Sequence, residues 1–198
     1  MQKNARGSRE EKEKPRLDHM KRNDAMRSRL AKIKSRLQET KVVWAIFAGA
    51  AAACYGSSRE ITDIDVLLRC EDLKKARAAL KDVDTEGFDI GCGADIKTSE
   101  GVCSFFLDDE MVARTNWKDI LGVTVPIMSA EDNIVFKAIL QRGEEKGKHD
   151  LEDIRSMAAH EKIDLAYLQK RVKKSSADKR VMPLLRQLIP NLFHSVEE

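Results

Sequence analysis

Two aspartates, Asp63 and Asp65, lie one residue apart in the segment Thr-Asp-Ile-Asp-Val-Leu-Leu. The apolar residues around them predict a strand. Because side chains alternate between the two faces of a strand, both carboxylates are expected on one face while Ile64 and Val66 enter the core. Two carboxylates held side by side repel each other unless a cation lies between them. Mg²⁺, or Mn²⁺ in its place, is the usual cation, because it prefers oxygen ligands and leaves positions open for water and phosphate.

The residues that precede the aspartates are suited to binding phosphate. Gly49 and Ala50 lie between a predicted strand that starts at Trp44 and a short helix of small residues. Glycine lets the backbone approach a ligand, and the start of a helix presents free N–H groups to an anion. Hydroxyl and guanidinium donors follow at Ser57, Ser58 and Arg59. A phosphate cradle followed by a carboxylate pair predicts metal-dependent phosphoryl or nucleotidyl transfer.

An Asp-x-Asp pair alone is weak evidence for a metal site, because surface strands and turns often carry one by chance. Here the pair follows a glycine and an arginine, and apolar strands flank the motif, in the order that a phosphate-transfer site requires. The combination favours the metal-site interpretation over that of a polar turn.

The pattern Gly-Ala-x12-Asp-x-Asp, with Tyr55-Gly56 and Arg59 before the aspartates, resembles the signature of the DNA polymerase β-like nucleotidyltransferase superfamily. Within it, the chain is most similar to the small bacterial and archaeal enzymes that include abortive-infection-type toxins. The resemblance covers roughly residues 42–170. The chain departs from the signature at Ala50, where the family usually has Ser or Gly. Ala50 offers phosphate a backbone N–H but no hydroxyl.

The resemblance implies a third carboxylate on a neighbouring strand, which completes the metal site and helps to deprotonate the acceptor hydroxyl. Asp108 follows the apolar run Val102–Leu107, and Asp95 lies in Gly-Ala-Asp-Ile-Lys. Asp108 is favoured, because a strand as apolar as 102–107 is expected to be central. The alternative for residues 108–110 is a polar turn that closes the strand.

The resemblance also extends into the C-terminal part of the chain. The matching residues are Pro126, Ser129, Glu131, Asp132, Lys137, Lys148, Asp150 and Asp153. By this likeness Lys137 faces the phosphates of the nucleotide as a point charge. The alternative is that Lys137 is simply solvated. Ser129 with Asp132 three residues later predicts the capped start of a helix.

The implied activity is the transfer of a nucleoside monophosphate from an NTP to a hydroxyl of an acceptor, which can be tRNA or other RNA, a protein or a small molecule. An antitoxin or a second copy of the chain is an implied partner. The rival interpretation is a non-catalytic nucleotide- or RNA-binding module that keeps the fold with an incomplete set of carboxylates.

The 198 residues predict an α+β fold, a nucleotidyltransferase-like mixed sheet with flanking helices and a C-terminal helical region. The expected divisions are a disordered tail (1–16), a basic N-terminal helix (17–40), the α/β core (41–128) and a helical region (129–193). Residues 1–41 hold 14 Lys and Arg against 6 Asp and Glu, a net charge of +8.

The basic helix carries a thin apolar stripe at Met20, Met26, Leu30, Ile33 and Leu37. Its positive charge suits nucleic-acid phosphates, whereas the stripe suits packing against the core. Packing is favoured, because no aromatic residues are interleaved for base stacking.

The four cysteines show no metal-binding spacing, so the expectation is four reduced thiols in a cytoplasmic protein. The polar N-terminus predicts no secretory signal, and the Ala-rich run 42–58 is a poor candidate for a membrane span.

Overall fold

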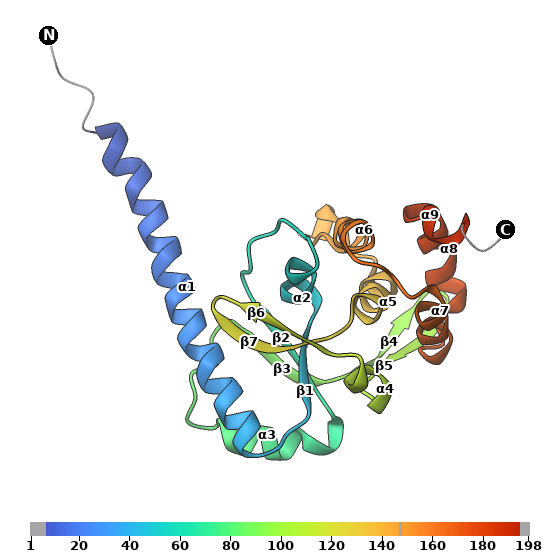
Figure 1. Ribbon diagram of the computed structural model, residues 1–198, viewed down its shortest axis with the longest axis horizontal. Helices are drawn as coiled ribbons and strands as arrows, with labels where there is room; N and C mark the ends of the chain where they lie inside the picture. Colours follow the sequence, from blue (N-terminus) through green and yellow to red (C-terminus); the bar gives the residue numbers. More distant parts are fainter. Residues whose placement is uncertain (1–6, 147, 195–198) are drawn as a thin grey trace, which may run out of the picture.

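The computed structural model describes residues 7–146 and 148–194 and shows an α+β fold, which confirms the predicted fold class (Figure 1). The strands are β1 (Trp44–Phe47), β2 (Ile64–Leu68), β3 (Phe88–Cys92), β4 (Ala94–Thr98), β5 (Gly101–Phe105), β6 (Asn116–Ile120) and β7 (Val123–Ile127). The α-helices are α1 (Gly7–Glu39), α2 (Ala48–Cys54), α3 (Leu73–Leu80), α4 (Asp109–Ala113), α5 (Ala130–Leu140), α6 (Asp150–His160), α7 (Leu165–Lys174), α8 (Asp178–Leu188) and α9 (Asn191–His194).

Five strands form one mixed sheet in the order β3-β2-β1-β7-β6. Strand β1 lies at its centre, antiparallel to β2 and parallel to β7. Strand β3 is an edge strand that pairs in parallel with β2, and β6 closes the other edge antiparallel to β7. Strands β4 and β5 form a separate antiparallel hairpin. The central strand is apolar because both of its faces are covered.

Helices cover both faces of the sheet. Helices α1 and α3 lie together on one face, and α2, α5 and α6 pack with one another on the other (Figure 1). The first residues of α5 are fixed by their sequence. The Ser129 hydroxyl accepts a hydrogen bond from the Asp132 N–H and donates one to the Asp132 carboxylate, so the predicted cap is confirmed.

Helix α1 begins at Gly7, ten residues before the expected start at Leu17, and residues 1–6 of the expected tail lie outside the described residues. Lys, Arg and Glu, which dominate residues 7–16, favour helix. Further along, Met26, Leu30, Ile33 and Leu37 are buried, whereas Met20 is 54% exposed. The apolar stripe therefore packs on the core from Met26 onward.

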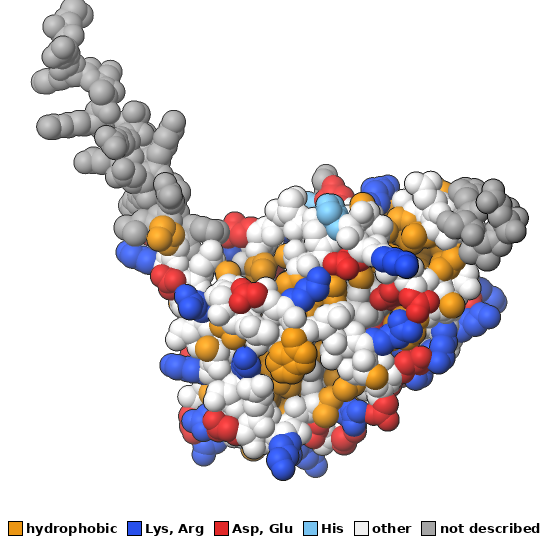
Figure 2. All heavy atoms as spheres, in the orientation of Figure 1, with side chains coloured by type: hydrophobic (Ala, Val, Ile, Leu, Met, Phe, Trp, Pro, Cys, Tyr) orange, Lys and Arg blue, Asp and Glu red, His pale blue; other side chains and the backbone are white. Residues whose placement is uncertain are grey.

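Charged side chains hold the same part of α1 to the body. Arg29 forms ion pairs with Asp84 and Glu86, and Arg22 lies 3.4 Å from Glu60. On the face shown in Figure 2, Lys and Arg side chains are interspersed with Asp and Glu. Mixed charges of this kind produce a weaker field than a patch of one sign.

Deleting residues 1–40 is expected to destabilise the protein severely, because it removes four buried apolar side chains, each of which contributes about 1.5–3 kcal/mol. Their sum is comparable with the whole stability of a typical domain. Deleting residues 1–22 should leave the melting temperature unchanged. Thermal melts of both truncated proteins measure the difference. Equal melting temperatures for the longer truncation and the full chain would contradict this role of the stripe.

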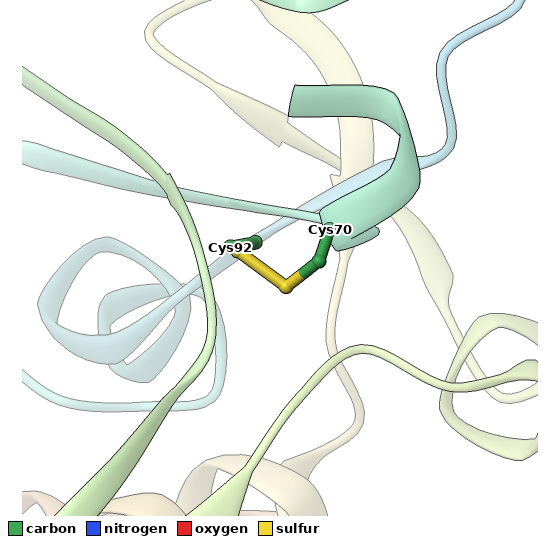
Figure 3. The surroundings of a disulfide bond; sticks show 2 residues. All are labelled: Cys70 and Cys92. Carbon is green, nitrogen blue, oxygen red and sulfur yellow. A yellow bond between two sulfur atoms is a disulfide. The ribbon is translucent and has the colours of Figure 1, made fainter. Parts of the chain in front are cut away.

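Cys70 and Cys92 form a disulfide with a Cα–Cα distance of 4.9 Å (Figure 3), whereas Cys54 and Cys103 are free thiols. The expectation of four reduced thiols is therefore wrong. The parallel register places Cys92 opposite Leu68 at the end of β2, two residues before Cys70. A sequence separation of 22 gives no hint of this proximity, because strand order alone creates it. No helix among the described residues is long and apolar enough to cross a membrane.

Candidate active site

The two motif aspartates meet a third at one cavity. In the parallel pairing of β2 with β3, Asp65 lies directly opposite Asp89, so the two side chains occupy the same face of neighbouring strands. Asp63, immediately before β2, shares that face. All three aspartates line a cavity of about 370 Å³. The structure thus brings Asp63 and Asp65 together, as predicted, and adds Asp89.

The electrostatics of Asp65 reflect this crowding. The pKa of the Asp65 carboxyl is raised to about 6, mainly by burial and then by the negative charges of Asp63 and Asp89, while Lys148 and Lys137 act in the opposite direction. A carboxylate held in a dry site beside two others is costly to ionise without a cation. The site is therefore arranged to favour a bound positive charge.

The rest of the cavity lining is divided between two cations and an apolar wall. Arg142 and Lys148 come from the connection between α5 and α6. The Nε of Arg142 donates to Asp150 at 2.8 Å, which fixes the guanidinium at the rim. The apolar wall is formed mainly by Phe47, Phe105 and Phe136 with Ile96 and Leu140. Charged side chains and an apolar wall therefore line the same cavity.

Asp108, the favoured candidate for the third carboxylate, is absent from the described residues that line the cavity. It precedes α4, where it accepts a hydrogen bond from the Met111 N–H, and it forms ion pairs with Arg171 at 2.6 Å and Lys174 at 2.8 Å. Burial acts to raise its pKa, but these three hydrogen bonds outweigh burial and lower the pKa to about 2. Asp108 has a structural explanation as a helix cap, and the third aspartate that lines the cavity is Asp89, from the strand beside β2.

Asp95, the other candidate, lies on β4 and accepts a hydrogen bond from the Ser104 hydroxyl at 2.6 Å. Its neighbour Ile96 lines the cavity. Because successive strand residues point to opposite faces, Asp95 is directed away from the cavity.

The residues predicted to bind phosphate do not line the cavity that holds the three aspartates. Of the described residues that line the cavity, none is Gly49, Ala50, Ser57, Ser58, Arg59 or Lys137. The side chains of Ser57 and Arg59 bind Asp153 instead, at 2.7 and 3.0 Å. Ser58 is exposed on the same turn. The turn that leads into Asp63 is therefore held against α6.

Lys137 is buried, with 2% of its side chain exposed, so it is not the solvated residue of the alternative. Its ammonium group lies 2.6 Å from Asp153 and 3.2 Å from Asp150, two carboxylates that are themselves buried. A buried charge requires such partners, because its desolvation is otherwise prohibitive. Lys137 thus neutralises the pair of aspartates that orients Arg59 and Arg142.

Asp153→Ala is expected to lower the free energy of unfolding by about 3 kcal/mol, because it removes one of the two partners of buried Lys137 and both hydrogen bonds to the 57–59 turn. Urea unfolding measures the loss. Glu152→Ala is the matched control, since that side chain is 57% exposed on the same helix. Equal unfolding midpoints for the two variants would show that this network does not stabilise the fold.

The first residue of α2, which directly follows β1, is strained. Ala48 adopts a left-handed conformation, with φ of 57°, and lines the cavity. Its N–H donates to the buried Asn133 side chain at 2.9 Å, and Asn133 in turn donates to the carbonyls of Met128 and Ser129. Helix α5 therefore fixes the start of α2 beside the carboxylates.

Sequence reasoning missed Asp89, Arg142, Asn133 and the phenylalanine wall as parts of the site. A signal for Asp89 exists, because Phe88-Asp89-Ile90 repeats the apolar–Asp–apolar pattern of Ile64-Asp65-Val66. That pattern becomes informative only once the two strands are known to be neighbours. No comparable signal marks Asn133.

Comparison with known proteins identifies the second half of the chain. Residues 91–188 match a family described as "Nucleotidyl transferase of unknown function". The match begins two residues after Asp89, so the three aspartates precede it. No curated protein matches the chain in sequence.

Solved structures that resemble the chain do so at low identity. Antibiotic-resistance factor ANT(2'')-Ia is 14% identical with a TM-score of 0.48, over 88% of this chain and 96% of that one. The lincosamide antibiotic adenylyltransferase LnuA is 15% identical with a TM-score of 0.44, over 68% and 97%. An antigenic nucleotidyltransferase-like protein from Paracoccidioides brasiliensis is 18% identical with a TM-score of 0.42, over 84% and 90%. Such distant likenesses say nothing about the substrates of this chain.

The finer likeness to abortive-infection-type toxins is not confirmed by these matches and stays a prediction. The broader recognition of a nucleotidyltransferase is confirmed by the family match, which covers residues C-terminal to the glycine and aspartate motif and not the motif itself. Over residues 91–188 the chain is similar to a family described as nucleotidyl transferases.

Proposed function

We propose that this protein transfers a nucleoside monophosphate from an NTP to a hydroxyl of an acceptor, at the cavity lined by Asp63, Asp65 and Asp89. The observation that supports this most strongly is the register that sets Asp65 opposite Asp89, with Asp63 on the same face. Three carboxylates at one cavity, with Arg142 and Lys148 on its rim, form a charge pattern that suits a metal–triphosphate complex.

The three aspartates fit Mg²⁺ or Mn²⁺ in donor chemistry, because all offer hard oxygen atoms. As placed, no three His, Cys, Asp or Glu side chains among the described residues converge closely enough to coordinate an ion. Burial and then the charges of Asp63 and Asp89 raise the pKa of Asp65, so a cation at this cavity would offset the cost of ionising that carboxyl. A bound divalent cation would polarise the α-phosphate and screen the charge of the triphosphate.

The residues of the chain then have distinct roles in the proposed reaction. Asp63, Asp65 and Asp89 would hold the cation, and the Asp89 carboxylate accepts the proton of the attacking hydroxyl. The acceptor oxygen forms a bond to the α-phosphorus while the bond from that phosphorus to the bridging oxygen breaks, and pyrophosphate leaves with the electron pair. Arg142 and Lys148 neutralise the leaving pyrophosphate, the role predicted for Lys137.

Gly49 and Ala50 do not line this cavity, so in this proposal they contribute as the start of α2, next to Ala48, and not as direct phosphate ligands. Ser57, Ser58 and Arg59 contribute by holding the turn before Asp63. We place the activity in the cytoplasm, where NTPs are available. RNA, protein and small-molecule acceptors, and an antitoxin or a second copy as partner, all remain compatible with this function.

Nucleotidyl transfer is tested by following two labels of the same NTP. Each NTP, labelled on the α- or on the γ-phosphate, is incubated with the protein, Mg²⁺ and a mixture of cellular RNA, protein and metabolites. The proposal predicts that the α-label joins an acceptor and that the γ-label leaves as pyrophosphate. Transfer of the γ-label would indicate a kinase instead. Binding of NTP without transfer of either label would favour the non-catalytic module.

A further inference from the structure

The apolar wall of the cavity has no role in holding a metal–triphosphate complex. Phe136 lies between Phe47 and Phe105, with ring centroids 4.9 Å from each. Phe47 and Phe136 are only partly buried, so part of each ring faces open space. Charged phosphates gain nothing from such a surface, because it offers neither hydrogen bonds nor counter-charge. The wall is suited to an uncharged, apolar group.

This wall begins at the reacting centre itself. In the antiparallel pairing of β1 with β2, Phe47 lies directly opposite Asp65, and Asp65 lies opposite Asp89 on its other side. Residues paired across strands share a face, with Cβ atoms about 5 Å apart. The Phe47 side chain therefore lies close to the group that carries the attacking oxygen. The nucleobase of the NTP is farther from the reacting centre, because a ribose separates it from the α-phosphorus.

Gly91 leaves room beside the wall. It lies two residues after Asp89, on the same face of β3, and lines the cavity. A Cβ atom added at Gly91 would meet no protein atom within 4 Å. Gly93 is different, because a Cβ atom there would lie 1.7 Å from the carbonyl oxygen of Phe105. Packing explains Gly93, but it does not explain Gly91, whose missing side chain opens space for a ligand.

We propose that the acceptor carries its hydroxyl on a flat apolar ring, as in a phenol, and that this ring binds between Phe47, Phe136 and the bare backbone of Gly91. The proposal rests on the proposed nucleotidyl transfer and names its acceptor class. The ring places the hydroxyl at Asp89, which takes its proton as the oxygen–phosphorus bond forms and pyrophosphate leaves. Aromatic rings favour offset or edge contacts of the kind that Phe47 and Phe136 already make.

Competing acceptors test this directly. The full chain with Mg²⁺ and α-labelled ATP is supplied with N-acetyl-tyrosinamide or with N-acetyl-serinamide, which has a hydroxyl but no ring. The proposal predicts a kcat/KM at least about 10-fold higher for the phenol, in the range that apolar pocket contacts provide. The series Gly91→Ala, Gly91→Val and Gly91→Leu should lower kcat/KM for the phenol progressively while leaving the KM for ATP unchanged.

Ala78→Leu is the matched control, because it adds the same bulk at an exposed position of α3. Thermal melts of all variants exclude misfolding as a cause, and the Gly91→Ala variant remains informative if larger residues disturb the strand. Equal use of both acceptors, or a Gly91 series without effect, would overturn the proposal. A rise in the KM for ATP along the series would also overturn it, because the occupant would then be the nucleobase.

Ligand-observed NMR separates this inference from the proposed function. N-acetyl-tyrosinamide is expected to show contact with the wild-type chain and progressively less with the Gly91 series, whether or not any transfer occurs. Ring contact without transfer of label to any acceptor would reject nucleotidyl transfer but keep the ring site. Transfer without ring contact would reject the ring site alone.

Discussion

Asp65→Asn is expected to eliminate nucleotidyl transfer while making the metal-free protein more stable. The loss of transfer should be at least about 10²–10³-fold, since the variant lacks a charged ligand at the reacting centre. The gain in stability follows from the raised pKa of Asp65, about 6, which records how strongly the fold disfavours the ionised side chain. Asn keeps the shape and removes the charge. Asp63→Asn should lose transfer as well.

The stability gained by Asp65→Asn depends on pH, because the folded and unfolded states of the wild type bind a proton at Asp65 over different pH ranges. Below the unfolded-state pKa of 3.8, Asp65 is protonated in both states and costs nothing. Between that value and about 6, the folded state retains a proton that the unfolded state has released, so wild-type stability falls as pH rises. Above about pH 6 the folded wild type bears the full cost of ionising Asp65. A pKa raised by about two units corresponds to roughly 3 kcal/mol.

Urea unfolding in EDTA at pH 4 and pH 8 measures this difference. The Asp65→Asn variant should exceed the wild type at pH 8 and approach it at pH 4. Asp82→Asn, at an exposed position, is the control and should show no such pattern. An Asp65→Asn variant that is less stable than the wild type at pH 8 would identify Asp65 as a structural residue and would contradict its role as a metal ligand.

Single substitutions of Asp89 and of Asp108 should have opposite effects on transfer and on stability. Asp89→Asn is expected to reduce transfer by about 10²–10³-fold without loss of stability, because Asp89 is a ligand in a crowded acidic site. Asp108→Asn should keep transfer near the wild-type rate but lower the free energy of unfolding by about 1–2 kcal/mol at pH 7. The reason is that Arg171 and Lys174 each lose an ion pair, although Arg171 keeps the one with Asp132.

The pH dependence of unfolding distinguishes the loss of the Asp108 ion pairs from a general disturbance of the fold. Its pKa is lowered to about 2, so its ion pairs stabilise the fold above 3.8 and are lost as pH falls from 3.8 toward 2. The wild type and Asp108→Asn should therefore converge in acid. Loss of transfer in Asp108→Asn with normal activity in Asp89→Asn would restore Asp108 as the third carboxylate.

Local patterns explain what the sequence could predict. Asp63 and Asp65 share a face because alternation along one strand is a short-range rule, and Ser129 caps α5 because its partner Asp132 is three residues away. The apolar stripe of α1 could also be predicted, because its spacing is a pattern within one helix. None of these features depends on which distant segment lies alongside.

The remaining parts of the site depend on strand order and burial, which single residues do not encode. Asp89 becomes a neighbour of Asp65 only because β3 pairs in parallel with β2. The same register unites Cys70 and Cys92. Lys137 has the side chain of a phosphate ligand, but the fold buries it against Asp150 and Asp153, and a sequence gives no measure of that burial.

Mn²⁺ binding, followed by electron paramagnetic resonance, tests the central claim most directly. The wild-type chain should bind Mn²⁺ at pH 7.5 in the presence of a non-hydrolysable ATP analogue, and binding should weaken below pH 6 as protons compete for Asp65. Asp63→Asn, Asp65→Asn and Asp89→Asn should each lose the bound ion, and Asp108→Asn should retain it. Unchanged Mn²⁺ binding in Asp65→Asn and Asp89→Asn would contradict a metal-dependent nucleotidyl-transfer centre at this cavity.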